Sequence, residues 1–193
     1  KTFFSSTMIR TNVPHKFLII LLFSFLISYS AQANWEPAKD GDKIILIRHS
    51  IAPGSGDPAG FKINDCKTQR NLSEEGINQS KKIGKLFKEN KIKVHKVLSS
   101  QWCRCKDTAK YAFGKYKEFS ALNSTFQSPY NKNAKKQLKE LKNYIKNWKG
   151  DGANLVLITH YVVITALTDK APRSGEIVII DKSLRVLSTI LTR

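Results

Sequence analysis

The sequence predicts an α/β fold, namely a three-layer α/β/α sandwich with a mostly parallel central sheet. The first reason is that short apolar runs rich in β-branched residues recur at 44–47, 94–98 and 155–158, as in strands buried on both faces. The second is that amphipathic helical segments separate these runs, and strands that alternate with helices favour parallel pairing. Two further strands, at 175–180 and 184–191, are predicted to form a terminal antiparallel pair.

The elements of the first half follow from local signals. The strand at 44–47 leads into a polar segment, residues 50–70, which contains Gly and Pro and is long enough to be a functional loop. Ser73 is expected to cap a helix that runs to about residue 91, because acids at 74 and 75 occupy its first turn, where the helix dipole favours them. After the second strand, Ser99 and Ser100 are candidates to cap a helix over 101–113.

The second half begins with a lysine-rich helix predicted over 130–148. Its apolar residues recur by fours and threes and therefore share one face; they are Ala134, Leu138, Leu141, Ile145 and Trp148. Glycines at 150 and 152 end this helix. The strand at 155–158 then leads to His160 and a short helix to about residue 167. No repeat, linker or low-complexity stretch interrupts 34–193, so these 160 residues are predicted to form one domain.

Residues 1–33 have the pattern of an N-terminal extension that contains a secretory signal peptide. Arg10 and Lys16 supply a positive region, an apolar stretch spans 17–27, and residues 31–33 read Ala-Gln-Ala, a cleavage site. Met8, the sole methionine, is the expected start. The apolar stretch is shorter than the roughly 20 residues that span a bilayer. We therefore expect cleavage rather than an uncleaved anchor, export to the bacterial periplasm or medium, and no stable membrane insertion afterwards.

The chain is strongly basic, with a formal net charge of +18. Three of its cations, Lys1, Arg10 and Lys16, fall in the leader, which leaves +15 for residues 34–193. Such a charge can attract anionic substrates, nucleic acid or a membrane surface, or it can reflect lysine as the default surface residue. The lysines are scattered along helices without interleaved aromatic residues or a DNA-binding motif, so we expect no nucleic-acid partner.

Cysteine usage fits an oxidising compartment. The chain has three cysteines, Cys66, Cys103 and Cys105, so one disulfide and one spare thiol are expected. Cys103 and Cys105 point in different directions on a helix, which favours a bridge from Cys66 to one of them and leaves open which one. A C-x-C pair with one distant cysteine lacks a fourth ligand at the usual spacing, so no metal site is expected.

Polar residues follow three of the predicted strands. The first strand ends in Arg48 and His49, the second leads to Arg104 in the first turn of a helix, and the third leads to His160 at a helix start. The carboxyl ends of parallel strands meet along one edge of a sheet. Two arginines, two histidines and two helix N-termini that converge there would form a strong phosphate site with a nucleophilic imidazole.

These residues stand in motifs that resemble those of the histidine phosphatase (phosphoglycerate mutase-like) superfamily, in its small-domain bacterial branch. The matching pieces are Leu46-Ile47-Arg48-His49-Ser50, then Arg70-Asn71-Leu72-Ser73-Glu74-Glu75-Gly76 with Gln79, then Leu98-Ser99-Ser100 with Arg104 and Asp107-Thr108-Ala109, then Ile158-Thr159-His160 with Ile164. They occur in the order found in that family and cover most of 43–170. The resemblance implies a phosphoglycerate mutase-like fold and a chemistry that needs no metal or other cofactor.

The resemblance also implies a role for each matched residue. His49 matches the nucleophile that becomes phosphorylated, Arg48 and Arg104 match the arginines that grip the phosphoryl oxygens, and His160 matches the second histidine of the pocket. Charge on a phosphoryl group in transfer spreads over its equatorial oxygens, so fixed cations stabilise it. An imidazole attacks only from an unprotonated nitrogen, so its other N–H is expected to be held by a backbone carbonyl.

Departures from the family pattern leave the proton donor open. Residues 121–126 hold no acid where larger members carry a glutamate, and Tyr161 follows His160 where the phytase-like branch has an aspartate. The long loop, residues 50–70, offers Asp57 and Asp65 as proton donors, and we favour Asp57. Its alternative role is to cap the loop, and a good leaving group would need no donor.

Three further residues are candidates for substrate binding. Ser50 stands at the usual position of a glycine, Asp65 lies in the long loop, and Arg70 either enters the pocket or braces that loop. The loops at 50–70 and 115–133 are expected to set specificity.

The leading hypothesis is a metal-independent phosphomonoesterase that acts through a phosphohistidine at His49 on a phosphorylated small molecule or envelope component. The alternative is a non-catalytic module of the same fold that binds phosphate ligands, which the missing acid motivates. A third hypothesis, a basic protein that binds the envelope or nucleic acid, rests on the net charge alone. Mutase activity is disfavoured, because 160 residues leave little room for insertions that enclose a bisphosphate.

Overall fold

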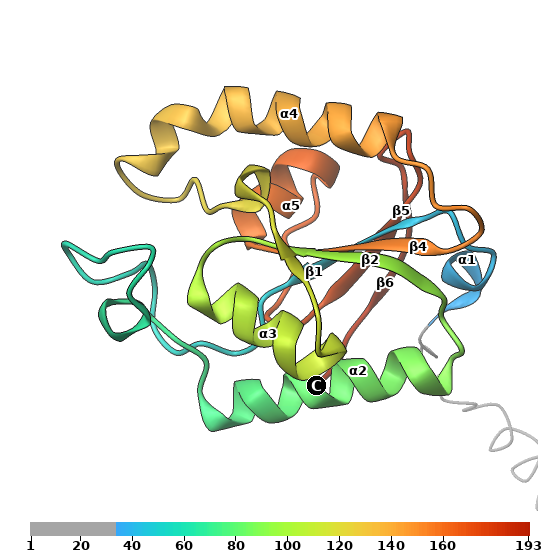
Figure 1. Ribbon diagram of the computed structural model, residues 1–193, viewed down its shortest axis with the longest axis horizontal. Coiled ribbons are helices and arrows are strands. Elements are labelled where there is room, and N and C mark those ends of the chain that lie inside the picture. The colour runs from blue at the N-terminus through green and yellow to red at the C-terminus, as the bar shows by residue number, and fades with distance from the viewer. Residues whose placement is uncertain (1–33) are drawn as a thin grey trace, which may run out of the picture. The chain divides into compact units, whose positions relative to one another are not determined.

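Six strands form one central sheet in the order β3-β2-β4-β1-β5-β6 in the computed structural model, which describes residues 34–193 (Figure 1). The strands are β1 (Ile44–Arg48), β2 (Val94–Ser99), β3 (Lys117–Glu118), β4 (Asn154–Thr159), β5 (Ile177–Ile180) and β6 (Val186–Ile190). Strands β1, β2, β3 and β4 pair in parallel. Strand β5 runs antiparallel to both β1 and β6. The predicted parallel sheet with a terminal antiparallel pair is confirmed.

The helices lie on both faces of this sheet. They are α1 (Glu36–Lys39), α2 (Glu74–Glu89), α3 (Cys103–Phe113), α4 (Ala134–Asn147) and α5 (Tyr161–Thr168). Helices α4 and α5 lie together on one side of the sheet, and α2 and α3 lie together on the other (Figure 1). This arrangement is the predicted three-layer sandwich. Among the described helices, none is long and apolar enough to cross a membrane.

Each central strand contributes to two cores, because successive side chains on a strand point to opposite faces. Ile45 and Ile47 of β1 pack into the core beneath α2 and α3, whereas Ile44 and Leu46 pack into the core beneath α4 and α5. Strands β4 and β5 divide their residues in the same way. Burial on both faces explains why these strands read as unbroken apolar runs.

Element boundaries differ from the sequence prediction at the starts of two helices. The segment predicted as one helix over 130–148 begins with a short 3-10 helix, η5 (Tyr130–Asn133), and continues as α4. Helix α3 begins at Cys103 with Trp102 at its N-cap position, and neither predicted serine cap forms. Strand β3 and helix α1 were not predicted, because two- and four-residue elements are too short to show a period. The predicted signal peptide lies outside the described residues.

The strand order places the ends of β1 and β4 side by side at the centre of the sheet. Their register pairs Ile44 with Leu155 at one end and Arg48 with Thr159 at the other. His49 and His160 each follow directly, so the sheet itself brings the two histidines together. Strand β2 lies on the other side of β4 and delivers residues 100–104 to the same edge.

Candidate active site

A small cavity of about 100 Å³ opens at the carboxyl ends of β1, β2 and β4. Its walls come from the segment after β1, the start of α3, the segment after the 3-10 helix η4 (Ser120–Leu122), and the start of α5. The lining residues are Arg48, His49, Gly54, Ser55, Gly56, Asp57, Arg70, Arg104, Ser124, Phe126, Gln127, His160, Tyr161 and Val162. All five predicted catalytic residues, namely Arg48, His49, Asp57, Arg104 and His160, therefore line one cavity.

His49 is held as a nucleophile needs to be. Its side chain is buried, with 3% of the residue exposed. Its Nδ1 lies 2.8 Å from the carbonyl oxygen of Ser50. Because a carbonyl oxygen only accepts, Nδ1 carries the proton and donates it, which leaves the lone pair on Nε2. Burial, followed by the nearby charge of Arg104, lowers the pKa of His49 well below its usual value, so the imidazole is neutral at neutral pH.

Ser50 does not line the cavity, which corrects its predicted role in substrate binding. Its backbone N–H donates to Thr108 Oγ1 at 3.0 Å, and its hydroxyl accepts from Ser80 Oγ at 2.8 Å. These bonds tie Ser50 to α2 and α3 and fix the carbonyl that orients His49. Its contribution is therefore to the orientation of the His49 ring.

His160 packs edge-on against His49, with ring centroids 5.5 Å apart. Its Nε2 lies 2.9 Å from Ser100 Oγ, and that hydroxyl donates in turn to Asn123 Oδ1 at 3.2 Å. The hydroxyl proton is thereby committed, so His160 Nε2–H is the donor and Nδ1 holds the lone pair. Burial, then the charge of Arg104, lowers the pKa of His160 well below its usual value. Both histidines are therefore neutral.

Three arginines surround these rings. Arg48 donates from Nη1 to the Pro172 carbonyl at 2.9 Å. Arg70 donates from Nε to the Gly56 carbonyl at 2.6 Å and from Nη1 to the Ala52 carbonyl. Arg70 therefore lines the cavity and also braces the loop at residues 50–70. The sequence left these two roles as alternatives, and the structure shows both.

The arginines gather positive charge that favours an anion. Burial, together with the charge of Arg104, lowers the pKa of Arg48 and that of Arg70. The Nε atoms of Arg48 and Arg104 are buried and have no hydrogen-bond partner among residues 34–193. A bound anion that neutralises this charge would relieve the repulsion, which makes the cavity a site for a phosphate-like group.

Asp57 lies in the cavity wall as the anionic partner of Arg104. Its Oδ1 is 2.8 Å from Arg104 Nη1, and the two side chains are 2% and 3% exposed. The carboxylate also accepts from the backbone N–H of Arg70 at 3.0 Å and from Trp102 Nε1 at 3.0 Å. Burial alone would raise the pKa of Asp57, but the hydrogen bond and charge of Arg104 bring it below the usual value. An ionised carboxylate that accepts three such bonds suits anchoring better than proton donation.

Asp65, the other candidate donor and predicted substrate-binding residue, is not brought to the cavity. It is exposed at the N-cap of the 3-10 helix η3 (Cys66–Thr68), where its Oδ1 accepts from the backbone N–H of Lys67 at 3.0 Å. Its turn-capping geometry is the one that short acidic side chains favour in loops.

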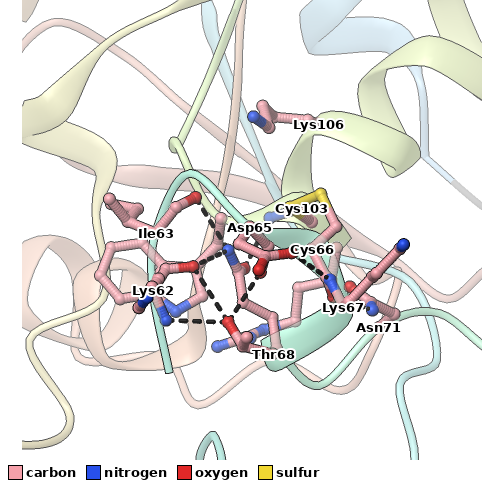
Figure 2. The surroundings of a disulfide bond; sticks show 12 residues. Lys62, Ile63, Asp65, Cys66, Lys67, Thr68, Asn71, Cys103 and Lys106 are labelled. Atoms are coloured by element: carbon pink, nitrogen blue, oxygen red, sulfur yellow. Dashed lines mark hydrogen bonds between the residues drawn. A yellow bond between two sulfur atoms is a disulfide. The ribbon is translucent and has the colours of Figure 1, made fainter. Parts of the chain in front are cut away.

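A disulfide joins Cys66 of the long loop to Cys103 at the start of α3 (Figure 2). This settles which of the two open pairings forms. The backbone N–H of Cys103 also donates to Gln69 Oε1 at 3.0 Å, so the loop and the helix are joined twice. The third cysteine, Cys105, is free and buried, and burial raises the pKa of its thiol to about 12.

Several residues in or beside the cavity carry no motif in the sequence. Trp102 reaches Asp57 through its ring N–H, and Gln127 Oε1 accepts from the backbone N–H of Asp57 at 2.9 Å. Phe126 and Tyr161 stand at the cavity wall. Residues 124–127 belong to the loop at 115–133 that was expected to set specificity, but no pattern there marks individual residues. Within residues 34–193, no group of three or more His, Cys, Asp or Glu side chains is arranged to hold a metal ion.

The sequence matches no protein-family model and no curated protein. Solved structures do match the fold. The protein histidine phosphatase SixA, complexed with tungstate, is 15% identical, with a TM-score of 0.55, covering 78% of this chain and 97% of that one. A phosphoglycerate mutase from Thermus thermophilus is 18% identical, with a TM-score of 0.53, covering 77% and 98%. From residue 34 onward, the chain therefore has the same fold as these two structures, a phosphoglycerate mutase-like fold.

Proposed function

We propose that the protein is a phosphomonoesterase whose nucleophile is His49. The observation that carries this proposal is the orientation of the His49 ring: its Nδ1–H is held by the Ser50 carbonyl, and its Nε2 is left for attack beside three arginines. A neutral imidazole and a cationic wall are the two requirements of phosphoryl transfer to histidine.

The reaction has two balanced steps. In the first, the Nε2 lone pair attacks phosphorus, the bond from phosphorus to the ester oxygen breaks, and the leaving group departs with that electron pair. In the second, water attacks the phosphohistidine, the N–P bond breaks, and inorganic phosphate and neutral His49 result. Arg48, Arg70 and Arg104 stabilise the charge that the equatorial oxygens carry in both transition states.

The structural neighbours support the same chemistry. One is a protein histidine phosphatase with bound tungstate, a tetrahedral oxyanion with the shape of phosphate. We carry only the class of ligand to this chain, namely a phosphorylated substrate. The physiological substrate, including an envelope component, stays a prediction, and so does export. Export is supported by the signal-peptide pattern of residues 1–33 and by the disulfide, a bond typical of oxidising compartments.

A second candidate function is a non-catalytic module that binds phosphate ligands. It is favoured by the commitment of Asp57 to Arg104, which leaves no carboxylic acid in the described cavity ready to protonate a leaving group. The two functions differ in whether phosphate becomes covalently attached to His49.

The deciding experiment uses residues 34–193, p-nitrophenyl phosphate and a chelator. We expect steady release of phosphate, and we expect His49→Ala to reduce it to background without a change in the circular dichroism spectrum. The matched control is His95→Ala, because His95 is an exposed histidine on β2 outside the cavity and its loss should leave turnover unchanged. Rapid quenching with radiolabelled substrate should trap an acid-labile phosphoenzyme in the parent protein and in the control, but not in His49→Ala. Phosphate binding without turnover or label would establish the binding module instead.

A further inference from the structure

Two aromatic rings stand exposed beside the cavity. Within residues 34–193, the large apolar side chains with exposed surface are Tyr111 at 39%, Phe126 at 51%, Tyr161 at 40% and Leu191 at 58%. Phe126 and Tyr161 both line the cavity, whereas Tyr111 and Leu191 do not. Exposed apolar residues scattered singly need no explanation, but two aromatic rings beside one cationic pocket place apolar surface where a ligand would lie.

Each ring lies next to a part of the phosphate site. A Cβ built on Gly56 would come within 3.7 Å of the Phe126 ring, so this ring lies against the loop segment that leads into Asp57. Tyr161 follows His160 directly, and the guanidinium carbon of Arg48 lies 5.7 Å from the centre of the Tyr161 ring. A group bound to the phosphoryl phosphorus would therefore leave the cavity along these rings.

The cavity is large enough for the phosphoryl group of a substrate but not for the rest of the molecule. About 100 Å³ lined by three arginines and two histidines suits a phosphoryl group, and the rest of the molecule must lie at the mouth. Half-exposed phenyl and phenol rings offer a planar apolar surface there. Aromatic rings prefer offset or edge-on contact with other rings, and such contacts add affinity beyond the burial of apolar area.

The chemistry of the site points to the same kind of leaving group. Among the residues that line the cavity, Asp57 is the sole carboxylate, and it is committed to Arg104. The Nδ1–H of His49 already donates to the Ser50 carbonyl oxygen, and the Nε2–H of His160 already donates to Ser100 Oγ, so neither is free to protonate a leaving group. A phenolic oxygen, with a pKa near 10, can depart as a phenolate and take its proton from water. An aliphatic alkoxide is a far poorer leaving group without an acid.

Building on the phosphatase activity proposed above, we propose that the preferred substrates are aryl phosphates, whose ring packs against Phe126 and Tyr161 while the phosphoryl group enters the cavity. The bond from phosphorus to the phenolic oxygen breaks as His49 attacks, the electron pair leaves with the phenolate, and solvent protonates it. Phe126 is thus a specificity residue that contacts the leaving group.

The test compares kcat/KM for p-nitrophenyl phosphate with kcat/KM for acetyl phosphate, which has a good leaving group and no ring. Phe126→Ala should lower the ratio of kcat/KM for p-nitrophenyl phosphate to kcat/KM for acetyl phosphate by roughly 3- to 10-fold, mainly because KM for p-nitrophenyl phosphate rises. Phe126→Tyr, which keeps a ring, should restore the ratio. Tyr111→Ala is the matched control, because Tyr111 is an exposed ring on α3 outside the cavity and its loss should change the kinetics of neither substrate.

The outcomes separate this inference from the phosphatase proposal. Hydrolysis of acetyl phosphate that depends on His49, together with an unchanged ratio in Phe126→Ala, would overturn the aryl specificity and leave the phosphatase intact. Hydrolysis of neither substrate would overturn both. A comparison of kcat/KM for free phosphotyrosine with that for a phosphotyrosine peptide shows whether the aryl group belongs to a small molecule or to a protein. For both substrates, Phe126→Ala must lower kcat/KM.

Discussion

At the scale of single residues, the Asp57 carboxylate holds the guanidinium of Arg104 in a place from which water is largely excluded. Both side chains are almost fully buried, and the ring N–H of Trp102 donates to the second carboxylate oxygen. A charge-assisted hydrogen bond of this kind is stronger and more directional than a bond between neutral groups. Arg104 can therefore present its remaining N–H groups to an anion without reorganisation, which is the property that electrostatic catalysis requires.

Asp57→Asn tests whether this carboxylate anchors Arg104 or donates a proton. We expect kcat for p-nitrophenyl phosphate to fall about 10- to 100-fold, because Arg104 loses its anionic partner and its position. The measurement is the pH profile of kcat for an alkyl phosphate such as glycerol 2-phosphate, because an alkoxide leaving group needs a proton whereas p-nitrophenolate does not. If Asp57 anchors Arg104, the parent protein keeps its activity as the pH rises through 4–7; a donor would lose its proton, and the activity, in that range.

The stability of the same variant gives a second readout with a definite sign. Because the pKa of Asp57 is lowered in the folded state, its stabilisation is fully present above the unfolded pKa of about 3.9 and is lost as pH falls through the folded value. The stability gap between the parent and Asp57→Asn, measured by urea unfolding, should therefore shrink below about pH 4. Asp65→Asn is the matched control: Asp65 is exposed outside the cavity, and both measurements should stay at the parent values.

At the scale of elements, the position of helix α2 depends on two glycines that permit close backbone contact. A Cβ on Gly76 would clash with the Ile51 carbonyl oxygen, and a Cβ on Gly84 would clash with the Ala112 carbonyl oxygen. The first contact sets α2 against the segment that follows His49, and the second sets it against α3. Since α2 also contacts Ser50 through Ser80, its position affects the Ser50 carbonyl that orients the His49 ring.

Gly84→Ala should separate α2 from α3. The added methyl meets backbone, which cannot move aside as a flexible side chain would, so we expect a loss of about 1–3 kcal/mol in the free energy of unfolding. Chemical denaturation measures this loss. The control is Asn78→Ala on the exposed face of the same helix, which should be neutral or slightly stabilising because alanine favours helix. Equal stability of Gly84→Ala and the parent would show that the two helices can shift without cost.

At the scale of the whole molecule, the disulfide connects the two parts of the chain that carry Arg70 and Arg104. Cys66 and Cys103 are 37 residues apart in sequence and close a loop that includes α2 and β2. The loop at residues 50–70 has one short 3-10 helix as its regular structure, so the cross-link restricts a segment with few regular backbone hydrogen bonds. Its main effect is expected on the unfolded ensemble, whose freedom it reduces.

Replacement of both Cys66 and Cys103 by Ser should lower the free energy of unfolding by roughly 2–5 kcal/mol. A reductant should produce a similar loss in the parent protein and none in the double variant, which makes the variant its own control. Urea unfolding with and without reductant measures both effects. A parent protein whose unfolding curve does not respond to complete reduction of the bond would contradict the stabilising role.

The sequence predicted the sheet, the layers and four cavity residues because their signals are local. Buried strands are short apolar runs, and Arg48, His49, Arg104 and His160 stand directly after strands or at helix starts, where the carboxyl edge of a parallel sheet must place them. The carbonyl that holds the Nδ1–H of His49 follows from the chemistry of an attacking imidazole, and the structure identifies it as that of Ser50.

The tertiary structure decided what depends on the path of the loops. The sequence offers both Asp57 and Asp65 as candidates in one loop, and contacts with Arg104, Trp102 and Gln127 draw Asp57 into the cavity wall while Asp65 remains at the surface. The cysteine partner of the long loop and the aromatic rings at the mouth were settled in the same way. Local propensity fixes strands and helices, whereas a loop takes its course from contacts between residues far apart in the chain, which no period in the sequence records.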